Sequence, residues 1–450
     1  MPDKEPAPEH HRVVIVGGGF AGLHAARRLG RLGFDVTLLD KRNFHLFQPL
    51  LYQVATGLLS PGNIAVPQRV VLRRYPRVRC LTGTAYDLEP GRRLLRHEHG
   101  ELEYDTLIVA TGVKHHYFGN EHWREFAPGL KTVEHAIEMR RKLFRAFERA
   151  ELEDDARRRR ALMNFVIVGG GPTGVELAGA IGELCHKTMV RDFRRIRSRD
   201  ARVVLIEGAG SVLPVYPEKL QRSARRQLET LGVEVLTDAR VTDIDAEGVT
   251  YTRDGDEQRL DAQTVLWAAG VRASHFGEVL AERTGVELDR GGCVRVAPDC
   301  SLPSHPEIFV VGDLGRLTDA RGREVPGLAP AAIQQGDYVA RVIAARQRGR
   351  VPPPFRYRDR GSMAVIGFNR AVGDLHWARV SGMPAWFIWA FVHIWSLIDF
   401  RQRLAVFTEW TWKYLTRGAG DRLITGDPTR TSALRAERLS RRPESDAGSD

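Results

Sequence analysis

One glycine-rich pattern constrains the fold of this chain more than any other feature. The short β-branched run Val13–Val16 is followed by three glycines spaced G-x-G-x-x-G, at Gly17, Gly19 and Gly22. The first glycine allows a tight turn, the second lets the backbone approach a pyrophosphate, and the third lets the next helix pack close to the strand. A second strand then ends at Asp40, whose carboxylate can accept hydrogen bonds from a ribose. This order predicts a βαβ unit that binds a nucleotide; the alternative is a glycine-rich turn without a ligand.

The same pattern occurs a second time and predicts a second nucleotide. The strand is Phe165–Val168, and the three glycine positions are held by Gly169, Gly171 and Gly174. Two such units in one chain indicate an α/β fold with two Rossmann-like dinucleotide-binding domains.

The second unit differs from the first in length. Its second strand ends at Glu207, 38 residues after Gly169, whereas Asp40 follows Gly17 by 23 residues. A basic insertion at about residues 186–200 accounts for the difference. Glu207 can bond both hydroxyls of an unmodified ribose and repels a 2′-phosphate, which favours NADH over NADPH.

Two further strands end in glycine turns, Leu107–Gly112 and Val265–Gly270. They are spaced like strands at which a chain crosses from one nucleotide domain to the other. We therefore expect Thr111 and Gly112 to contact the first nucleotide and Gly270 to contact the second.

A third run, Ile308–Asp313, ends with an acid after a glycine. In flavoproteins with two dinucleotide domains this pattern places a carboxylate on the ribityl chain of FAD, which makes Asp313 the candidate there. The alternative is that Asp313 caps the next helix.

The order of these elements predicts the domain organisation. The stretch 134–160 reads as a connecting helix, with Met139, Leu143, Phe147 and Ala150 on one face. We expect disordered tails at 1–11 and 428–450, an FAD domain in two parts at 12–120 and 301–345, an NADH domain at 121–300, and a separate C-terminal region at 346–427.

Four more segments make the sequence specific enough to identify a family: Phe47–Pro67, Gly327–Ala340, Gly361–Gly367 and Leu423–Gly426. With both glycine motifs, the chain resembles the type II, or alternative, NADH:quinone oxidoreductases from about residue 12 to residue 426. The resemblance implies a peripheral membrane flavoenzyme with non-covalent FAD, often a homodimer, that reduces quinone without pumping protons.

The resemblance also implies roles for particular residues. Glu176, in the first turn of the second motif's helix, is expected near the nicotinamide and the quinone as a proton relay; the alternative is an acid stabilised by the helix dipole. Tyr52 and Gln53 are expected to line the flavin or quinone pocket, although a packed loop is a rival interpretation. Gln334 is expected at the flavin edge and the quinone, as a catalytic and FAD-contacting residue. Pro330 stands where the family often has a further glutamine, so the quinone type stays open.

The C-terminal region is rich in tryptophan, with six of the chain's eight at 377, 386, 389, 395, 410 and 412. Tryptophan suits the boundary between lipid headgroups and acyl chains. The apolar run Pro384–Ile398 has 15 residues, fewer than the roughly 20 that span a bilayer. With Leu404–Leu415 it predicts two adjacent amphipathic helices that lie on a membrane. Packing on the enzyme body or in a dimer interface is the alternative.

Composition narrows the remaining possibilities. The formal charge of +11 fits an anionic membrane surface, and equally a solvated basic surface with no specific partner. The basic residues form no nucleic-acid motif. Four cysteines without C-x-x-C spacing and no export pattern favour a reducing compartment, so we expect a peripheral protein on the cytoplasmic face of the membrane. No metal-ligand spacing is present. The rival functions are a soluble FAD-dependent NAD(P)H reductase of a protein or dye, and a non-catalytic nicotinamide-binding sensor.

Overall fold

The computed structural model describes residues 11–416 and 421–425. Apart from His11, the tails expected to be disordered, 1–11 and 428–450, lie outside the described residues.

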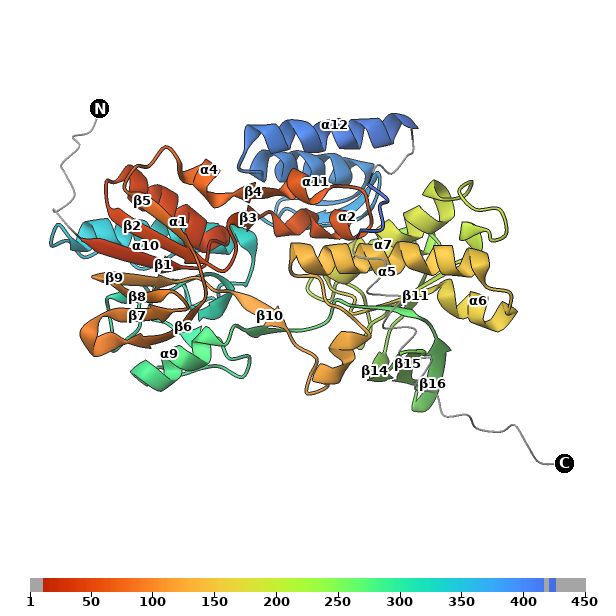
Figure 1. Cartoon of the computed structure of the whole chain (residues 1–450), viewed down its shortest axis with the longest axis horizontal. Coiled ribbons are helices and arrows are strands. Elements are labelled where there is room, and N and C mark those ends of the chain that lie inside the picture. The colour runs from red at the N-terminus through yellow and green to blue at the C-terminus, as the bar shows by residue number, and fades with distance from the viewer. Residues whose placement is uncertain (1–10, 417–420, 426–450) are drawn as a thin grey trace.

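The first glycine loop follows the middle strand of a parallel sheet. The sheet has five strands in the order β20-β9-β1-β2-β5, with bounds β1 (Arg12–Val16), β2 (Asp35–Asp40), β5 (Val78–Thr82), β9 (Thr106–Val109) and β20 (Ile308–Val310). Helices α1 (Phe20–Arg31) and α10 (Ala329–Arg346) pack against each other beside it (Figure 1). A Cβ atom at Gly336 would lie 2.2 Å from the carbonyl oxygen of Ala21, so the two helices approach very closely.

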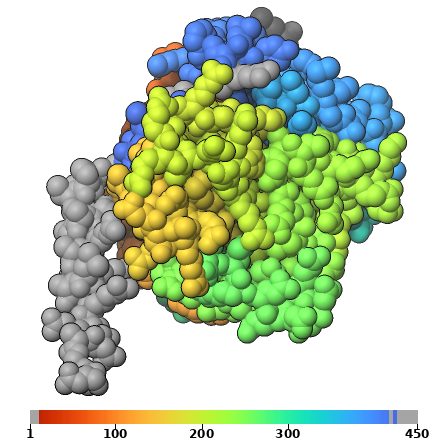
Figure 2. Space-filling view, turned by 90° about the vertical axis from the view of Figure 1, so that its right-hand side faces the viewer, coloured from red at the N-terminus to blue at the C-terminus, as the bar shows by residue number. Residues whose placement is uncertain are grey.

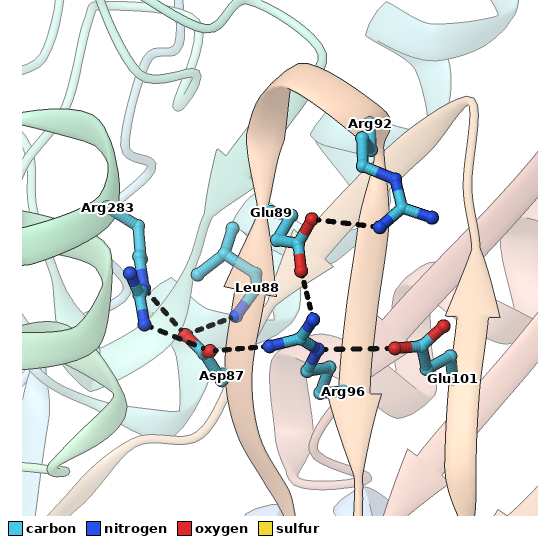
Figure 3. A network of polar contacts seen from close by, with 7 residues as sticks. All are labelled: Asp87, Leu88, Glu89, Arg92, Arg96, Glu101 and Arg283. Carbon is cyan, nitrogen blue, oxygen red and sulfur yellow. Dashed lines mark hydrogen bonds and ion pairs between the residues drawn. The ribbon is translucent and has the colours of Figure 1, made fainter.

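The other face of this sheet is covered by a small antiparallel sheet and a helix. These are β6 (Ala85–Glu89), β7 (Leu94–His97), β8 (Gly100–Glu103) and α9 (Phe276–Thr284). Phe276 and Leu280 of α9 are buried in one cluster with Val14 of β1. Figure 3 shows Arg283 of α9 bonding both carboxylate oxygens of Asp87, at 2.8 and 3.1 Å.

This packing corrects one predicted boundary. Residues 276–302 contribute to the core of the first unit, so the chain returns to that unit near residue 271, earlier than the predicted 301. The sequence concealed this because Asp87 and Arg283 meet across 196 residues.

The second glycine loop follows a strand of a second parallel sheet. Its strand order is β13-β12-β11-β17, with bounds β11 (Asn164–Val168), β12 (Arg202–Ile206), β13 (Val233–Leu236) and β17 (Thr264–Trp267). Three helices, α5 (Val133–Leu152), α7 (Pro172–Glu183) and α8 (Glu218–Glu229), contribute side chains to the core on one face. The antiparallel strands β14 (Ala239–Ile244), β15 (Gly248–Arg253) and β16 (Asp256–Asp261) contribute to the other.

Two short strands lie side by side where the chain crosses between the units. They are β10 (Val113–His115) and β18 (Val271–Ala273), which pair antiparallel. Figure 1 shows β10 in this connection. The sequence placed the crossing at the strands that end in Gly112 and Gly270; in the structure the crossing strands begin directly after these two glycines.

Helix α5 and the short α6 (Ala156–Leu162) replace the single connecting helix expected at 134–160. The predicted apolar face of α5 is confirmed, since Met139, Leu143, Phe147 and Ala150 are all buried. The break falls at Glu153 to Asp155, where Asp155 caps α6 by accepting the Arg158 N–H.

The C-terminal region packs on the second unit. Strand β22 (Ser362–Gly367), with β23 (Arg370–Asp374) and β24 (Arg379–Gly382), lies on α7. A Cβ atom at Gly179 of α7 would lie 1.6 Å from the carbonyl oxygen of Ile366, so only glycine permits this contact.

Two adjacent helices follow, as predicted: α11 (Met383–Ser396) and α12 (Phe400–Thr416). Figure 1 shows them one above the other at one edge of the molecule. The tryptophans divide between two roles, because Trp389 and Trp410 are 1% and 7% exposed while Trp395 and Trp412 are 66% and 64% exposed. In the described part of the chain no helix combines the length and the apolar character that a membrane crossing requires.

Candidate active site

The two glycine loops share one backbone geometry. Gly17 and Gly169 have positive φ angles of 101° and 107°, which residues with a side chain rarely adopt. A Cβ atom at Gly22 would lie 1.8 Å from the carbonyl oxygen of Gly17, and one at Gly174 would lie 1.7 Å from that of Gly169. The first and third glycines of each loop are therefore required by the turn and by the close packing of the helix.

The middle glycine of each loop faces open space. No atom lies within 4 Å of a Cβ atom built at Gly19 or Gly171. These residues are the N-caps of α1 and α7, and no side chain caps either helix. A helix N-terminus with free space before it suits a pyrophosphate. The residues of both loops thus fit dinucleotides, while the phosphate contacts themselves stay a prediction.

The acid at the end of each second strand is held at its loop. Asp40 accepts the Gly18 N–H with one oxygen and the Arg42 N–H, at 2.7 Å, with the other. Burial raises the pKa of Asp40, and these two N–H donors oppose the rise. Glu207 repeats the arrangement by accepting the N–H groups of Gly170 and Ala209, the latter at 2.7 Å. Their contacts with ribose stay predictions.

The predicted turn residues lie at opposite ends of the paired crossing strands β10 and β18, with Thr111 and Gly112 at one end and Gly270 at the other. Thr111 and Ser274 share a hydrogen bond of 2.5 Å between their hydroxyl oxygens. The Ser274 N–H donates to the Gly112 carbonyl at 3.0 Å. Gly112 and Gly270 have positive φ angles of 66° and 69°, and a Cβ atom at Gly270 would lie 2.6 Å from the ring of Phe118.

Asp313 lies in a short turn between β20 and α10. The Gly312 N–H of this turn donates to the side-chain oxygen of Gln335 at 2.6 Å. Lys131, from the segment before α5, faces Asp313 across the two units; burial lowers the pKa of Lys131 and the charge of Asp313 opposes this. Asp313 is thus placed between the units, and its contact with a ribityl chain stays a prediction.

The structure gives Gln334 and its neighbour different positions. The Gln334 side-chain amide donates to the Arg358 carbonyl at 3.0 Å, and the Gln334 side-chain oxygen accepts the Arg358 N–H at 3.0 Å. Gln335, which the sequence did not single out, is 3% exposed and reaches the turn at Gly312. In this structure Gln334 therefore holds the segment that leads to β22, and its contacts with flavin and quinone stay predictions.

A pocket with a cavity volume of about 40 Å³ lies between α7 and the two C-terminal helices. Tyr52 and Gln53 of α2 (Leu51–Ala55) line it together with Glu176 of α7. The structure thus brings together three site residues that the sequence predicted. The rest of the lining comes from several elements: Thr56, Leu58, Ala180, Glu183, Leu184, Thr188, Val365, Ile366, Gly367, Phe368, Trp386, Trp389, Trp410 and Lys413.

Hydrogen bonds and ring stacking fix one wall of the pocket. The Gln53 side-chain amide donates to the Tyr52 hydroxyl at 2.7 Å, and the Trp410 indole N–H donates to the Gln53 side-chain oxygen at 2.8 Å. Trp410 stacks on Trp389 with ring centres 5.3 Å apart. Tyr52 and Gln53 therefore form part of a packed wall as well as lining the pocket.

The carboxyl group of Glu176 is largely enclosed. Glu176 is partly exposed as a residue, but it lines the pocket, and burial raises its pKa to about 8. A hydrogen bond from the Val365 backbone opposes that rise. Burial also raises the pKa of Tyr52, and the charge of Glu176 adds to the effect. Glu176 is therefore mostly protonated at neutral pH.

A second carboxylate in the pocket was not predicted. Glu183 lies two helical turns after Glu176 on α7, accepts the Phe368 N–H at 2.8 Å and lies 3.7 Å from the Lys413 ammonium nitrogen. The helical spacing of Glu176 and Glu183 could have revealed that they share a face. Lys413 and Trp410 were missed because they lie more than 220 residues further along the chain.

The described residues contain no group of three or more His, Cys, Asp or Glu side chains that could hold a metal ion.

The position of Glu207 leads to a prediction about donor choice. In Glu207→Gln the carboxylate that we expect to repel a 2′-phosphate is gone, and one acceptor for the loop N–H groups is kept. We expect the ratio of kcat/KM for NADH to that for NADPH to fall about tenfold, a change of roughly 1.4 kcal/mol, because discrimination at such a ribose rests on this charge. Asp40→Asn, the equivalent change in the first unit, should leave the ratio unchanged. An unaltered ratio in Glu207→Gln would remove the residue from the donor site.

Comparison with known proteins agrees with this geometry. Residues 11–336 match the family model for pyridine nucleotide-disulphide oxidoreductases, and residues 360–417 match that for the NDH2 C-terminal domain. The type II NADH:quinone oxidoreductase Ndh of Mycobacterium tuberculosis is 44% identical, over 97% of this chain and 96% of the relative. A protein of the same description from Staphylococcus haemolyticus is 28% identical, over 85% of this chain and 94% of the relative.

The solved structure of NDH2 from Plasmodium falciparum in complex with NADH has the same fold, with a TM-score of 0.84 over 92% of this chain and all of that chain, at 19% identity. The two-unit α/β fold and the family resemblance are thereby confirmed. This chain belongs to the type II NADH:quinone oxidoreductase family.

Proposed function

We propose that this chain oxidises NADH and reduces a quinone, using non-covalently bound FAD. When bound, FAD accepts a hydride from NADH and passes two electrons to the quinone. The proposal rests on two matching glycine loops, Gly17–Gly22 and Gly169–Gly174, each of which follows a strand of its own parallel sheet. The two units are joined where the crossing strands β10 and β18 pair. One chain can thus hold two dinucleotides at adjoining units.

Each nucleotide has its own set of proposed contacts. In the first unit the glycine loop holds the FAD pyrophosphate, Asp40 its ribose, Thr111 and Gly112 the ring system, and Asp313 the ribityl chain, with Gln334 at the flavin edge. In the second unit the glycine loop holds the NADH pyrophosphate, Glu207 the ribose and Gly270 the nicotinamide end. The middle glycines support this arrangement, since both leave space at a helix N-terminus.

The pocket between α7 and the C-terminal helices is the proposed quinone site. Tyr52 and Gln53 supply polar groups in an aromatic wall, and Gln334 is proposed to approach from the first unit. Reduction of a quinone consumes two protons, and Glu176, with its pKa raised to about 8 by burial, holds a proton at neutral pH. Glu176 is therefore the proposed donor of one of them.

The outer faces of α11 and α12 are the proposed membrane contact. Residues four apart along α11 present large apolar side chains to the solvent, namely Met383, Phe387, Phe391 and Trp395, and α12 adds Phe400, Leu404, Phe407 and Trp412. A row of this size suits the interface of a bilayer. We propose that the chain attaches in this way to the cytoplasmic face of the membrane and that it is a homodimer, which would present two such faces.

Steady-state turnover tests the proposal. The purified full chain, loaded with FAD, should be yellow, release its flavin on denaturation, and oxidise NADH with a short-chain quinone as acceptor. NADH binding without turnover would favour a sensor. Turnover with dyes or a protein acceptor but with no quinone would favour a soluble reductase.

A further inference from the structure

The basic side chains of the insertion in the second unit have no role in the proposed chemistry. Between residues 186 and 200 it carries two acids, Asp192 and Asp200, and six Lys or Arg residues: Lys187, Arg191, Arg194, Arg195, Arg197 and Arg199. A stretch with this excess of positive charge attracts anions.

The backbone of the insertion is tied to the protein. The Glu151 carboxylate of α5 accepts the backbone N–H groups of Arg194, Arg195 and Ile196 at 2.9 to 3.0 Å. Phe193 stacks on Phe147 with ring centres 5.7 Å apart. The segment therefore has a fixed course, on which the arginine side chains at 191, 194, 197 and 199 are exposed.

The insertion lies beside the C-terminal end of α12. Asp192 forms an ion pair with Arg422, which follows that helix. Thr188 lines the same pocket as Trp410 and Lys413 of α12. Figure 2 shows the insertion, in yellow-green, reaching up to the level of the helices drawn in blue.

This end of α12 carries exposed apolar side chains. Trp412, Tyr414 and Leu415 are all more than half exposed. Basic side chains at the rim of an apolar face meet the phosphates of lipid headgroups when the face enters a bilayer, and the planar guanidinium group binds phosphate well. The positive charge of the insertion therefore lies beside the apolar end of α12, where the phosphates of lipid headgroups would lie.

We propose that Arg191, Arg194, Arg197 and Arg199 form a binding site for the headgroups of anionic phospholipids. The inference rests on the membrane attachment proposed above and adds a lipid preference to it. The helices α11 and α12 supply contact with any bilayer, while the insertion makes the contact stronger on an anionic one.

Co-sedimentation of the full-length, FAD-loaded protein with vesicles tests this inference. One set of vesicles contains phosphatidylcholine alone and the other contains phosphatidylcholine mixed with phosphatidylglycerol. The triple variant R194Q/R197Q/R199Q should bind the anionic vesicles about 100-fold more weakly, since each basic residue near such a surface contributes roughly tenfold or somewhat less. Its binding to the neutral vesicles should be unchanged.

A matched control removes three other exposed arginines, in R240Q/R290Q/R295Q. Arg240 belongs to β14, and Arg290 and Arg295 follow α9 in the chain. In Figure 1 β14 and α9 lie at the edge of the molecule opposite α12. The control should keep most of the preference for anionic vesicles. Both triple variants should keep wild-type turnover with a water-soluble quinone, which shows that they fold.

Three outcomes would contradict the inference. An equal loss in the two triple variants would mean that total charge, and not the insertion, sets lipid preference. A wild-type protein that binds neutral and anionic vesicles equally would leave the attachment standing and remove the headgroup site. If R194Q/R197Q/R199Q lost binding to a short RNA duplex but bound anionic vesicles as well as the wild-type protein does, the insertion would be a contact for nucleic acid. Failure of the wild-type protein to bind either vesicle would instead contradict the membrane attachment itself.

Discussion

Gly22→Ala should yield a protein that no longer retains FAD, whereas Gly174→Ala should yield a yellow protein that NADH no longer reduces at ordinary concentrations. The two substitutions are physically alike. Each places a methyl group less than 2 Å from the carbonyl oxygen of the first glycine in its loop, at 1.8 Å and 1.7 Å. Because the obstacle is backbone, the helix must move away from the loop. Overpacking of this kind costs about 1 to 3 kcal/mol, so we expect each affinity to fall by between about fivefold and somewhat more than about 100-fold.

Flavin absorbance per polypeptide after gel filtration measures the loss of FAD from Gly22→Ala. The dependence of flavin bleaching on NADH concentration measures the loss of NADH affinity in Gly174→Ala. Gly91→Ala is the matched control, because no atom lies within 4 Å of a Cβ atom built there. Both affinities should be unchanged in this control. Full flavin content in Gly22→Ala, or normal NADH affinity in Gly174→Ala, would mean that these loops do not hold the two nucleotides.

Glu176→Gln should slow the reoxidation of the reduced enzyme by quinone about 100-fold while its reduction by NADH stays close to the wild-type rate. General acid catalysis by one side chain typically contributes this much, and glutamine keeps the size of the side chain but cannot give up a proton. Glu148→Gln, at an exposed position on α5, is the control: it makes the same Glu-to-Gln exchange outside the pocket. Equal slowing of both half-reactions would indicate a structural defect instead.

The same residue predicts a pH dependence. Burial raises the pKa of Glu176 to about 8, so its acid form predominates below pH 8 and is lost above it. Reoxidation of the wild-type enzyme by quinone should therefore slow as the pH rises through about 8, and this decline should be absent in Glu176→Gln. A decline that persists unchanged in the variant would assign the titration to another group.

The sequence predicted those features that a local backbone requirement imposes. The loops at Gly17 and Gly169 need positive φ angles and a close helix contact, and such needs leave a spacing that can be recognised without a structure. Glu207 was found despite the basic insertion because an acid at the end of a buried strand is also a local pattern. The two C-terminal helices were predicted from their tryptophan content and apolar runs, which are also local features of the sequence.

Features that depend on packing between residues far apart in the sequence could not be predicted from local patterns. The return to the first unit near residue 271 depends on the packing of α9 against β6, which joins residues about 200 positions apart. Gln334 and Gln335 are neighbours on one helix, and only the packing of α10 decides which of them faces inward. Trp410 and Lys413 enter the pocket because the C-terminal helices fold back over α2 and α7.

The most direct test of the proposed electron path is anaerobic stopped-flow spectroscopy of the FAD-loaded protein. Mixing with NADH should bleach the flavin absorbance in one phase, and a second mixing with a short-chain quinone should restore it fully. The same cycle with NADPH should be slower in the first step only. Flavin that stays oxidised with saturating NADH, or reduced flavin that quinone does not reoxidise, would contradict the assignment of this chain as an enzyme that carries electrons from NADH to quinone.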